Sequence, residues 1–297
     1  MKKRFKASKK PFNILKIVII LIISFSITYF LKDHYDFIFK NSINNIDSYF
    51  KLNLFKKDFF IKYAILSEAS NKDDTYLGDY IKDIGTNDIA NNIDIYIYNS
   101  HQTESYQYQK INPYNVYPTV LLASYSLREK LKDYKINAYV ETNNITEILR
   151  ANNWNYKYSY EASRLLIKDF LANNNPKLII DLHRDSASYE KTTTIINGDS
   201  YAKVLLVVGK KHENYLTNFN LANQINDLIK NEDNSLSRGI SLKDGKGVNG
   251  IYNQDLASNM ILLELGGQYN TFLEIDNTLN IVAKVLYLYL NGNTQKE

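Results

Sequence analysis

Short apolar runs alternate with longer amphipathic stretches over the last two thirds of the chain. The apolar runs predict five strands, at residues 93–98, 136–140, 178–182, 204–208 and 260–265. Apolar positions at helical spacing predict four helices, near residues 116–133, 157–173, 216–231 and 275–291. Apolar strands that alternate with helices indicate a mostly parallel sheet with helices on both faces. We therefore predict one α/β domain over residues 91–292.

The N-terminal part of the chain has a different pattern. Residues 12–31 form an apolar stretch, interrupted near its start by Lys16, of about the length that spans a bilayer core. Six Lys or Arg residues precede it, so the positive-inside rule places the N-terminus in the cytoplasm. No Ala-x-Ala site follows, which favours a retained helix over a cleaved signal peptide. This pattern predicts a cytoplasmic tip (1–11), a single transmembrane helix (12–31), a membrane-proximal stalk (32–90) and an α/β domain outside the cytoplasm.

Composition and charge restrict the classes of site and partner. The chain has no cysteine, so disulfides and thiolate metal ligands are excluded. Any metal must be held by histidine and carboxylate, which suits zinc best. Eight of the 36 Lys and Arg residues lie in the first 32 positions, which contain no Asp or Glu. The rest of the chain has 28 basic and 32 acidic residues, so its net charge is −4. A slightly acidic domain is not typical of a nucleic-acid-binding protein.

Ionisable side chains lie at or just after several predicted strands. His101 and Glu104 follow the first strand, His183 follows the third and Glu264 ends the last. Functional groups of open α/β sheets collect outside the carboxyl ends of the strands. A catalytic zinc commonly has three protein ligands. We therefore predict His101, Glu104 and His183 as metal ligands and Glu264 as the general base of a hydrolase; Glu141, after the second strand, is the alternative third ligand.

Each of these residues also has a structural interpretation. The pattern His-x-x-Glu is weak, and His101 alone could be a capping or loop residue. His183 lies in a run of ionisable residues, 181–185, that could be a structural ion-pair cluster. Glu264 interrupts an apolar strand, and a buried carboxylate needs a partner. The other two histidines, His34 and His212, are interpreted as a membrane-edge residue and a solvated surface residue.

Five segments, in order along residues 91–290, together resemble the stage II sporulation protein P family of cell-wall hydrolases. They are Tyr98–Tyr106, Ile180–Ser186, Val207–Lys210, Tyr252–Leu256 and Leu263–Thr271. The resemblance implies a zinc-dependent N-acetylmuramoyl-L-alanine amidase fold, of the phosphorylase/hydrolase-like kind. It implies cleavage of the amide between N-acetylmuramic acid and the L-alanine of the stem peptide, with peptide cross-links as a further substrate. By the same likeness, His101 and His183 are metal ligands, Glu104 is the best-placed third ligand and Glu264 is the catalytic carboxylate.

The resemblance also implies a setting. Family members are anchored by one N-terminal helix and act on peptidoglycan outside the membrane, beside a partner wall hydrolase or membrane protein, during engulfment of the forespore. This chain departs from the family pattern at Asn99, where the family usually has a histidine, and its predicted stalk is short. These departures leave general wall remodelling open as an alternative to sporulation itself.

Two arginines are candidates for substrate binding. Arg184 and Arg238 are predicted to bind stem-peptide carboxylates, because a guanidinium pairs with a carboxylate in a bidentate manner. A structural salt bridge, for example to Asp185, is the alternative. Two other functions remain open, a carboxypeptidase-type zinc peptidase and a catalytically inactive wall-binding scaffold.

Overall fold

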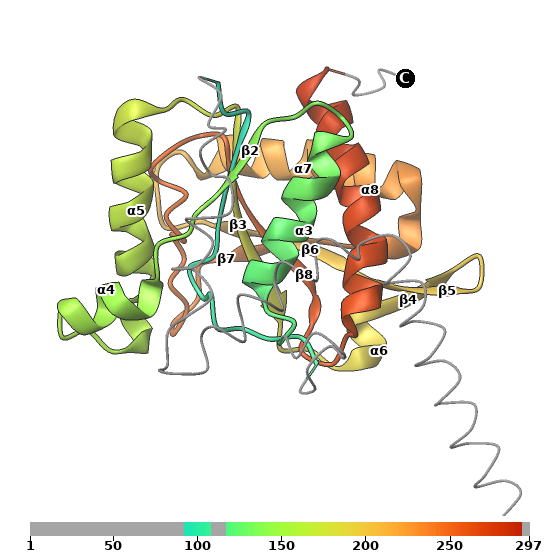
Figure 1. Cartoon of the computed structure of the whole chain (residues 1–297), viewed down its shortest axis with the longest axis horizontal. Helices are drawn as coiled ribbons and strands as arrows, with labels where there is room; N and C mark the ends of the chain where they lie inside the picture. Colours follow the sequence, from blue (N-terminus) through green and yellow to red (C-terminus); the bar gives the residue numbers. More distant parts are fainter. Residues whose placement is uncertain (1–91, 108–116, 293–297) are drawn as a thin grey trace, which may run out of the picture. The chain divides into compact units, whose positions relative to one another are not determined.

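A six-stranded mixed sheet forms the centre of the part of the chain that the computed structural model describes, residues 92–107 and 117–292 (Figure 1). Its strands lie in the order β2–β1–β3–β8–β6–β7. Neighbouring strands are parallel except for β6 and β8, which are antiparallel. The sheet is therefore mostly parallel, as predicted. The bounds are β1 Ile95–Tyr98, β2 Ala138–Val140, β3 Leu178–Asp185, β6 Val204–Gly209, β7 Ser237–Lys243 and β8 Met260–Gly267.

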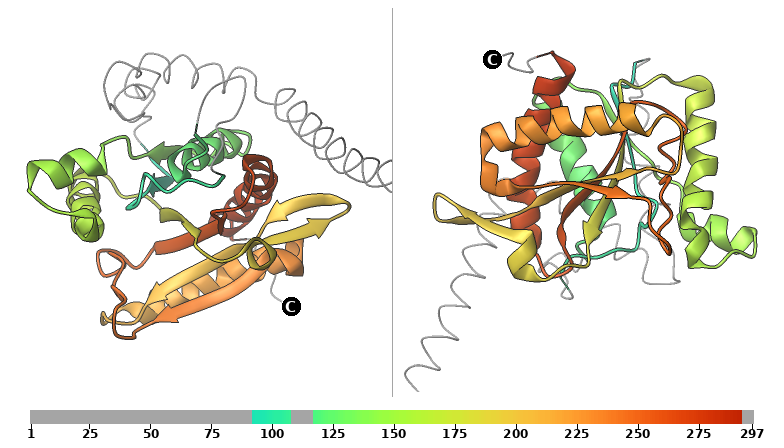
Figure 2. Two further views of the ribbon diagram at one scale, coloured as in Figure 1. Left: turned by 90° about the horizontal axis from the view of Figure 1, so that it is seen from below. Right: turned by 180° about the vertical axis from the view of Figure 1, so that it is seen from behind.

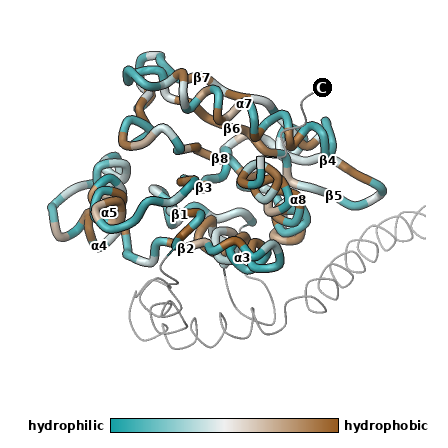
Figure 3. Tube along the Cα trace, turned by 90° about the horizontal axis from the view of Figure 1, so that it is seen from above, coloured by the Kyte–Doolittle hydropathy of each residue, from teal (hydrophilic) through white to brown (hydrophobic). Residues whose placement is uncertain are grey.

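Helices cover both faces of the sheet (Figure 3). Helix α8 (Phe272–Leu290) packs against both α3 (Val120–Lys132) and α7 (Tyr215–Glu232) on one face. Helix α5 (Ser159–Asn173) lies on the other face, beside the short helix α4 (Ile145–Ala151). The α/β architecture with helices on both faces is thus confirmed.

The alternation of residues in β1 explains this layering. Successive side chains of a strand point to opposite faces, so Ile95 and Ile97 share one face while Tyr96 and Tyr98 share the other. All four are almost fully buried. The two tyrosines pack with Ile167 of α5. Because both faces of β1 are covered, its side chains are apolar or aromatic throughout.

A buried ion pair connects the helices on the first face. Lys130 of α3 lies 3.2 Å from the Asp276 carboxylate of α8, and both side chains are about nine-tenths buried. Ser126 donates a hydrogen bond of 2.8 Å to the same carboxylate. Helix α8 begins with a capping box, in which Thr271 and Glu274 satisfy each other's backbone amides.

Several elements were not predicted from the hydropathy pattern. Strand β7 lies at one edge of the sheet, and a hairpin of β4 (Thr193–Ile196) and β5 (Asp199–Ala202) projects from the domain (Figure 2). Asn197 and Gly198 form its tip with φ of 52° and 90°, as a tight hairpin turn requires. Short elements complete the description: α4, α6 (Tyr189–Thr192) and the 3₁₀ turns η2 (Tyr156–Tyr158) and η3 (Asn234–Leu236).

The predicted transmembrane helix and stalk, with His34, lie outside the described residues. In the described part of the chain, no helix combines the length and the apolar character needed to cross a bilayer. The membrane anchor at residues 12–31 therefore stays a prediction.

Candidate metal centre and catalytic carboxylate

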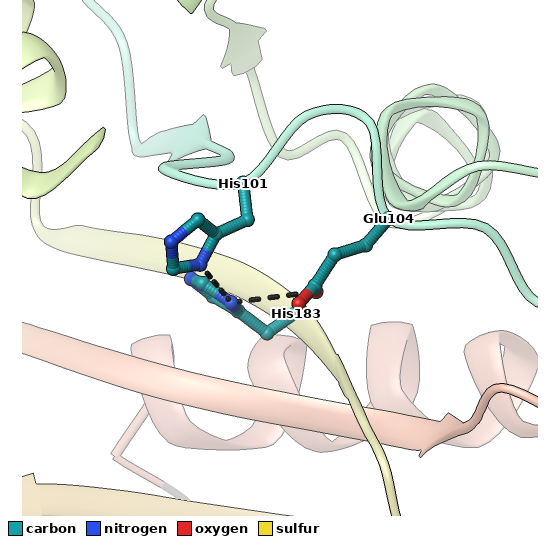
Figure 4. A group of neighbouring side chains, drawn as sticks. All are labelled: His101, Glu104 and His183. Atoms are coloured by element: carbon teal, nitrogen blue, oxygen red, sulfur yellow. Dashed lines mark hydrogen bonds and ion pairs between the residues drawn. The ribbon is translucent and has the colours of Figure 1, made fainter. Parts of the chain in front are cut away.

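The structure brings His101, Glu104 and His183 together, although His183 lies about eighty residues further along the chain (Figure 4). One potential ligand atom from each residue lies within 4.8 Å of the others. The Nδ1 atoms of the two histidines are 3.4 Å apart, and His183 Nδ1 is 3.5 Å from Glu104 Oε2. His101 and Glu104 approach the His183 ring from different sides. The three predicted ligands thus converge on one point.

The turn after β1 presents two of these side chains. The amide of Glu104 bonds to the carbonyl of His101 at 3.0 Å, which closes the turn. Gln102, between them, points inward and bonds to the carbonyl of Asn143 and the amide of Ile145. Because Gln102 is buried, His101 and Glu104 are directed to the opposite side of the turn, toward β3.

The two donor spacings at His183 Nδ1 fit zinc. A tetrahedral zinc holds nitrogen and oxygen ligands at about 2.0–2.2 Å, which places neighbouring ligand atoms about 3.3–3.5 Å apart. The separations of 3.4 Å from His101 Nδ1 and 3.5 Å from Glu104 Oε2 to His183 Nδ1 agree with this value. Two imidazoles and one carboxylate also match a known donor set of catalytic zinc sites.

A second carboxylate orients His183. Asp181 Oδ1 is 2.9 Å from His183 Nε2, and Ser100 Oγ is 2.8 Å from the same nitrogen. Ser100 donates its hydroxyl and its amide to Asp181, at 2.9 and 3.0 Å. An Nε2 proton donated to these oxygens leaves the Nδ1 lone pair directed at the cluster. Asp181 and His183 are almost fully buried, so this orientation is tightly held.

Glu264 lies on β8 directly beside His183, since the two residues are register partners in the parallel pair β3–β8. The Oε2 atom of Glu264 is shielded from solvent and forms no hydrogen bond. Burial raises the pKa of this carboxyl to about 7, against the opposing effect of His183 and with smaller contributions from nearby carboxylates. Such a group can take up and release a proton near neutral pH. The strand continues to Gly267, so Glu264 projects from the face of the sheet instead of its end, contrary to the expectation from sequence.

The charges of the cluster shift the pKa values of its members. Burial and the neighbouring His183 lower the pKa of His101. Burial alone would raise the pKa of Glu104, but the interaction with His183 outweighs it, and the net effect lowers the pKa. Burial disfavours the charged form of His183, yet Asp181 and Glu104 raise its pKa well above the ordinary value. The carboxylates around His183 therefore favour a positive charge at this site.

Glu141, the alternative third ligand, is engaged elsewhere. Its carboxylate accepts hydrogen bonds from the Tyr96 hydroxyl at 2.7 Å and from the backbone and side-chain amides of Asn143. Glu104 is the carboxylate that lies with the two histidines in the described part of the chain. Asn99 is buried and joins the carbonyl of Leu182 to Ser124, which is a structural role.

The two predicted substrate-binding arginines form contacts with groups close to the cluster in sequence. The Arg184 backbone amide donates to Glu104 at 3.2 Å, and its Nε donates to the carbonyl of Ser105 at 2.8 Å. Arg238 pairs with the Asp185 carboxylate at 2.7 Å. Both guanidinium groups are thus held near the cluster by the protein, and their binding of stem-peptide carboxylates stays a prediction.

His212, expected on the solvated surface, is instead half-buried with both ring nitrogens shielded from water, because it packs in the loop after β6.

Three tyrosines next to the cluster are not predicted from the sequence. Tyr160 contacts both imidazole rings, with centroids 5.2 Å from His101 and 6.2 Å from His183. Tyr156 lies 5.1 Å from His101, and Tyr252 lies 5.4 Å from Tyr160. The chain contains 25 tyrosines, so composition hid these three.

A mixed α/β sheet that carries a His–Glu–His cluster and a buried carboxylate defines a candidate metallohydrolase. The sequence profile of stage II sporulation protein P matches residues 56–287, which is most of the chain. The chain therefore belongs to the stage II sporulation protein P family. The protein of that name from Bacillus subtilis strain 168 is 37% identical over 205 residues, which are 64% of this chain and 49% of the relative. This chain thus matches about half the length of that relative.

Solved structures that are similar to this chain are distant in sequence. The CwlD amidase from Clostridioides difficile, in complex with the GerS lipoprotein, is 13% identical; the match covers 67% of this chain and 97% of that one, with a TM-score of 0.45. A metallo-carboxypeptidase from Burkholderia cenocepacia is 9% identical, with 70% and 59% coverage and a TM-score of 0.40.

Proposed function

We propose that this protein is a zinc-dependent N-acetylmuramoyl-L-alanine amidase that remodels the cell wall in sporulation. The observation that carries the proposal is the convergence of His101, Glu104 and His183 at zinc-ligand spacing, with the unpaired carboxylate of Glu264 on the adjacent strand. Membership of the stage II sporulation protein P family supports peptidoglycan as the substrate and sporulation as the setting.

His101, Glu104 and His183 would hold the zinc ion, since their donor atoms fit it. Zinc supplies Lewis acidity, which polarises a scissile carbonyl and makes water more acidic. Glu264 accepts a proton from the attacking water as the oxygen bonds to the carbonyl carbon. The same carboxyl then delivers that proton to the leaving nitrogen as the carbon–nitrogen bond breaks. A pKa of about 7 suits both transfers, because neither form of the carboxyl is strongly favoured near neutral pH.

The proposed location of the reaction rests on the N-terminal sequence. A single transmembrane helix at residues 12–31, with a cytoplasmic N-terminus, would place the catalytic domain next to the wall. We propose that the protein works there beside a partner wall hydrolase or membrane protein, and that it also cuts peptide cross-links. This arrangement limits its action to peptidoglycan within reach of the membrane.

The proposal is tested with purified full chain and isolated peptidoglycan. His101→Ala and His183→Ala should lower zinc content and abolish digestion, whereas Glu264→Ala should retain zinc and lose turnover. A matched control is Glu213→Ala, because Glu213 is exposed on the loop after β6. Zinc content is measured by metal analysis and cleavage by mass spectrometry of the soluble products.

The products distinguish the rival functions. Free stem peptides that begin with L-alanine, released from intact glycan, are expected of the amidase. Release of single C-terminal residues would show a carboxypeptidase-type zinc peptidase instead. Binding to the wall without any soluble product, with zinc supplied, would show an inactive scaffold. Full activity after complete removal of bound metal would refute the proposal.

A further inference from the structure

We propose that Tyr160 is a positioning residue for the metal centre, because its ring holds the His101 imidazole in the orientation needed to bind an ion. The inference rests on the proposed zinc centre and names the residue that orients one of its two imidazoles. The role belongs to the aromatic ring of Tyr160 and not to its hydroxyl.

The two imidazoles of the cluster are held in different ways. Hydrogen bonds of His183 Nε2 with Asp181 and Ser100 direct its Nδ1 at the cluster. In the part of the chain that the structure describes, the His101 ring has one polar contact with the protein, the 3.4 Å contact between the two Nδ1 atoms. That contact joins two ligand atoms, so it cannot orient the ring once both lone pairs bind an ion. The orientation of His101 therefore depends on its ring contacts.

The orientation of an imidazole ring matters for metal binding. The lone pair of a ring nitrogen lies in the plane of the ring, so the ion has to lie in that plane as well. Rotation of a histidine ring about the bond to Cβ has broad energy minima, and the side chain alone does not select one plane. A ring that is ordered only when the ion binds lowers the affinity, whereas a ring that is ordered beforehand does not.

Tyr160, near the start of α5, contacts both imidazoles. Its ring meets His101 edge to face, at 5.2 Å between centroids and 82° between planes, and lies almost parallel to His183, at 6.2 Å and 15°. The two imidazoles are 84° apart. Tyr156 also contacts His101, at 5.1 Å, but it belongs to the short turn η2, whereas Tyr160 belongs to a helix of 15 residues. Rotation of the His101 ring out of its plane would disrupt its edge-to-face contact with Tyr160.

The start of α5 is fixed by the segment at residues 249–256. Asn253 donates a hydrogen bond of 3.0 Å to the carbonyl of Tyr160. Arg164, one helical turn further on, forms a bidentate pair with Asp255 at 2.7 and 2.6 Å. These bonds tie the segment to the first two turns of the helix, so the backbone that carries the positioning ring is held from outside the helix.

The same segment is bound to the central sheet. The amide of Gly209 donates to Gln254 Oε1 at 2.9 Å, and Gln254 Nε2 donates to the carbonyl of Val207 at 2.8 Å. Tyr252 and Asn253 have left-handed backbone conformations, with φ of 53° and 59°. Strained backbone of this kind persists where surrounding contacts enforce it. The segment therefore connects β6 rigidly to α5, with Asn253 as the link to the positioning ring.

The zinc affinity of the full chain, measured by competition with a chelator, tests this role without relying on turnover. Tyr160→Leu removes both ring contacts and should weaken zinc binding roughly 5- to 20-fold. Tyr160→Phe keeps the ring and should bind zinc like the unaltered chain. Tyr158→Leu is the matched control, because Tyr158 precedes the same helix but its ring packs on Trp154, at 5.8 Å. It should leave the zinc affinity unchanged.

The link at Asn253 gives a second test that leaves the tyrosine in place. Asn253→Gly removes the bond to the carbonyl of Tyr160 and still allows the left-handed backbone. It should weaken zinc binding roughly 2- to 5-fold in the unaltered chain. In the Tyr160→Leu chain it should weaken binding no further, because both changes act through the same ring.

The outcomes separate this inference from the proposed function. Equal zinc affinities of Tyr160→Leu and the unaltered chain would overturn the inference and leave the zinc centre intact. An equal loss in Tyr160→Phe would also overturn it, since the hydroxyl would then be the active group, and so would additive losses in the double variant with Asn253→Gly. Failure of the unaltered chain to bind zinc would refute the proposed metal centre, and the positioning role with it.

Discussion

The buried carboxyl of Glu264 gives a quantitative prediction about the stability of the metal-free protein. Burial raises its pKa from the ordinary value of 4.5 to about 7, so the folded chain binds a proton more tightly than the unfolded chain. The stabilising effect of that proton is complete below about pH 4.5 and is lost as the pH rises through about 7. Over this range the difference in pKa corresponds to ~3 kcal/mol.

Replacement of Glu264 by glutamine removes this dependence, because the amide is neutral at every pH. We expect the free energy of unfolding of Glu264→Gln, relative to the unaltered chain, to rise by about 2–3 kcal/mol between pH 5 and pH 8. The measurement is urea unfolding of the metal-free proteins at both pH values, analysed by linear extrapolation. Only the change with pH is interpreted, since the substitution also alters local packing.

The surface variant Glu213→Gln provides the baseline, and its stability should follow that of the unaltered chain at both pH values. If the curves for Glu264→Gln and the unaltered chain run parallel between pH 5 and pH 8, the carboxyl is not desolvated as described, and its assignment as a proton carrier near neutral pH loses its physical basis.

Two further predictions concern groups that support the site and the fold. Asp181→Asn should lower zinc affinity roughly 10- to 100-fold, because it removes the carboxylate that orients His183. The affinity is measured by competition with a chelator, and Ser100→Ala should lower it less. If Asp181→Asn and the unaltered chain bind zinc equally well, this role of Asp181 is contradicted. Lys130→Met should reduce the free energy of unfolding by about 3 kcal/mol, since the buried Asp276 loses its ion pair with the lysine. The double variant that also carries Asp276→Leu should recover most of that loss, as measured by urea unfolding. If the losses of the two single variants add up in the double variant, the pairing is contradicted.

The sequence predicted the centre of the fold better than its edges. Strands β1, β3, β6 and β8 are apolar because helices cover both of their faces, and this produces a continuous hydrophobic run. Strand β7 has one neighbouring strand and reads Ser-Arg-Gly-Ile-Ser-Leu-Lys, so the same signal is absent. The hairpin β4–β5 did carry a signal, the Asn197-Gly198 pair, but its strands are too short to register in a hydropathy window.

The site was predictable where it depended on strand positions and not where it depended on packing. His101, Glu104, His183 and Glu264 are predictable because ionisable residues are rare in or after apolar strands. Asp181 shares a face with His183, two residues away, and that relation was readable in principle. The contacts of Tyr156, Tyr160 and Tyr252 arise from the approach of two separate segments, which no spacing in the sequence encodes.

The register between β3 and β8 places His183 and Glu264 side by side. Because side chains alternate between the two faces of a strand, a shift of β8 by one residue would turn Glu264 to the opposite side of the sheet. No intermediate displacement keeps the carboxyl near the cluster, so the proposed catalysis by Glu264 should depend in an all-or-none manner on correct strand pairing. The rate at which activity recovers during refolding would therefore report the rate at which two strands about eighty residues apart in sequence pair.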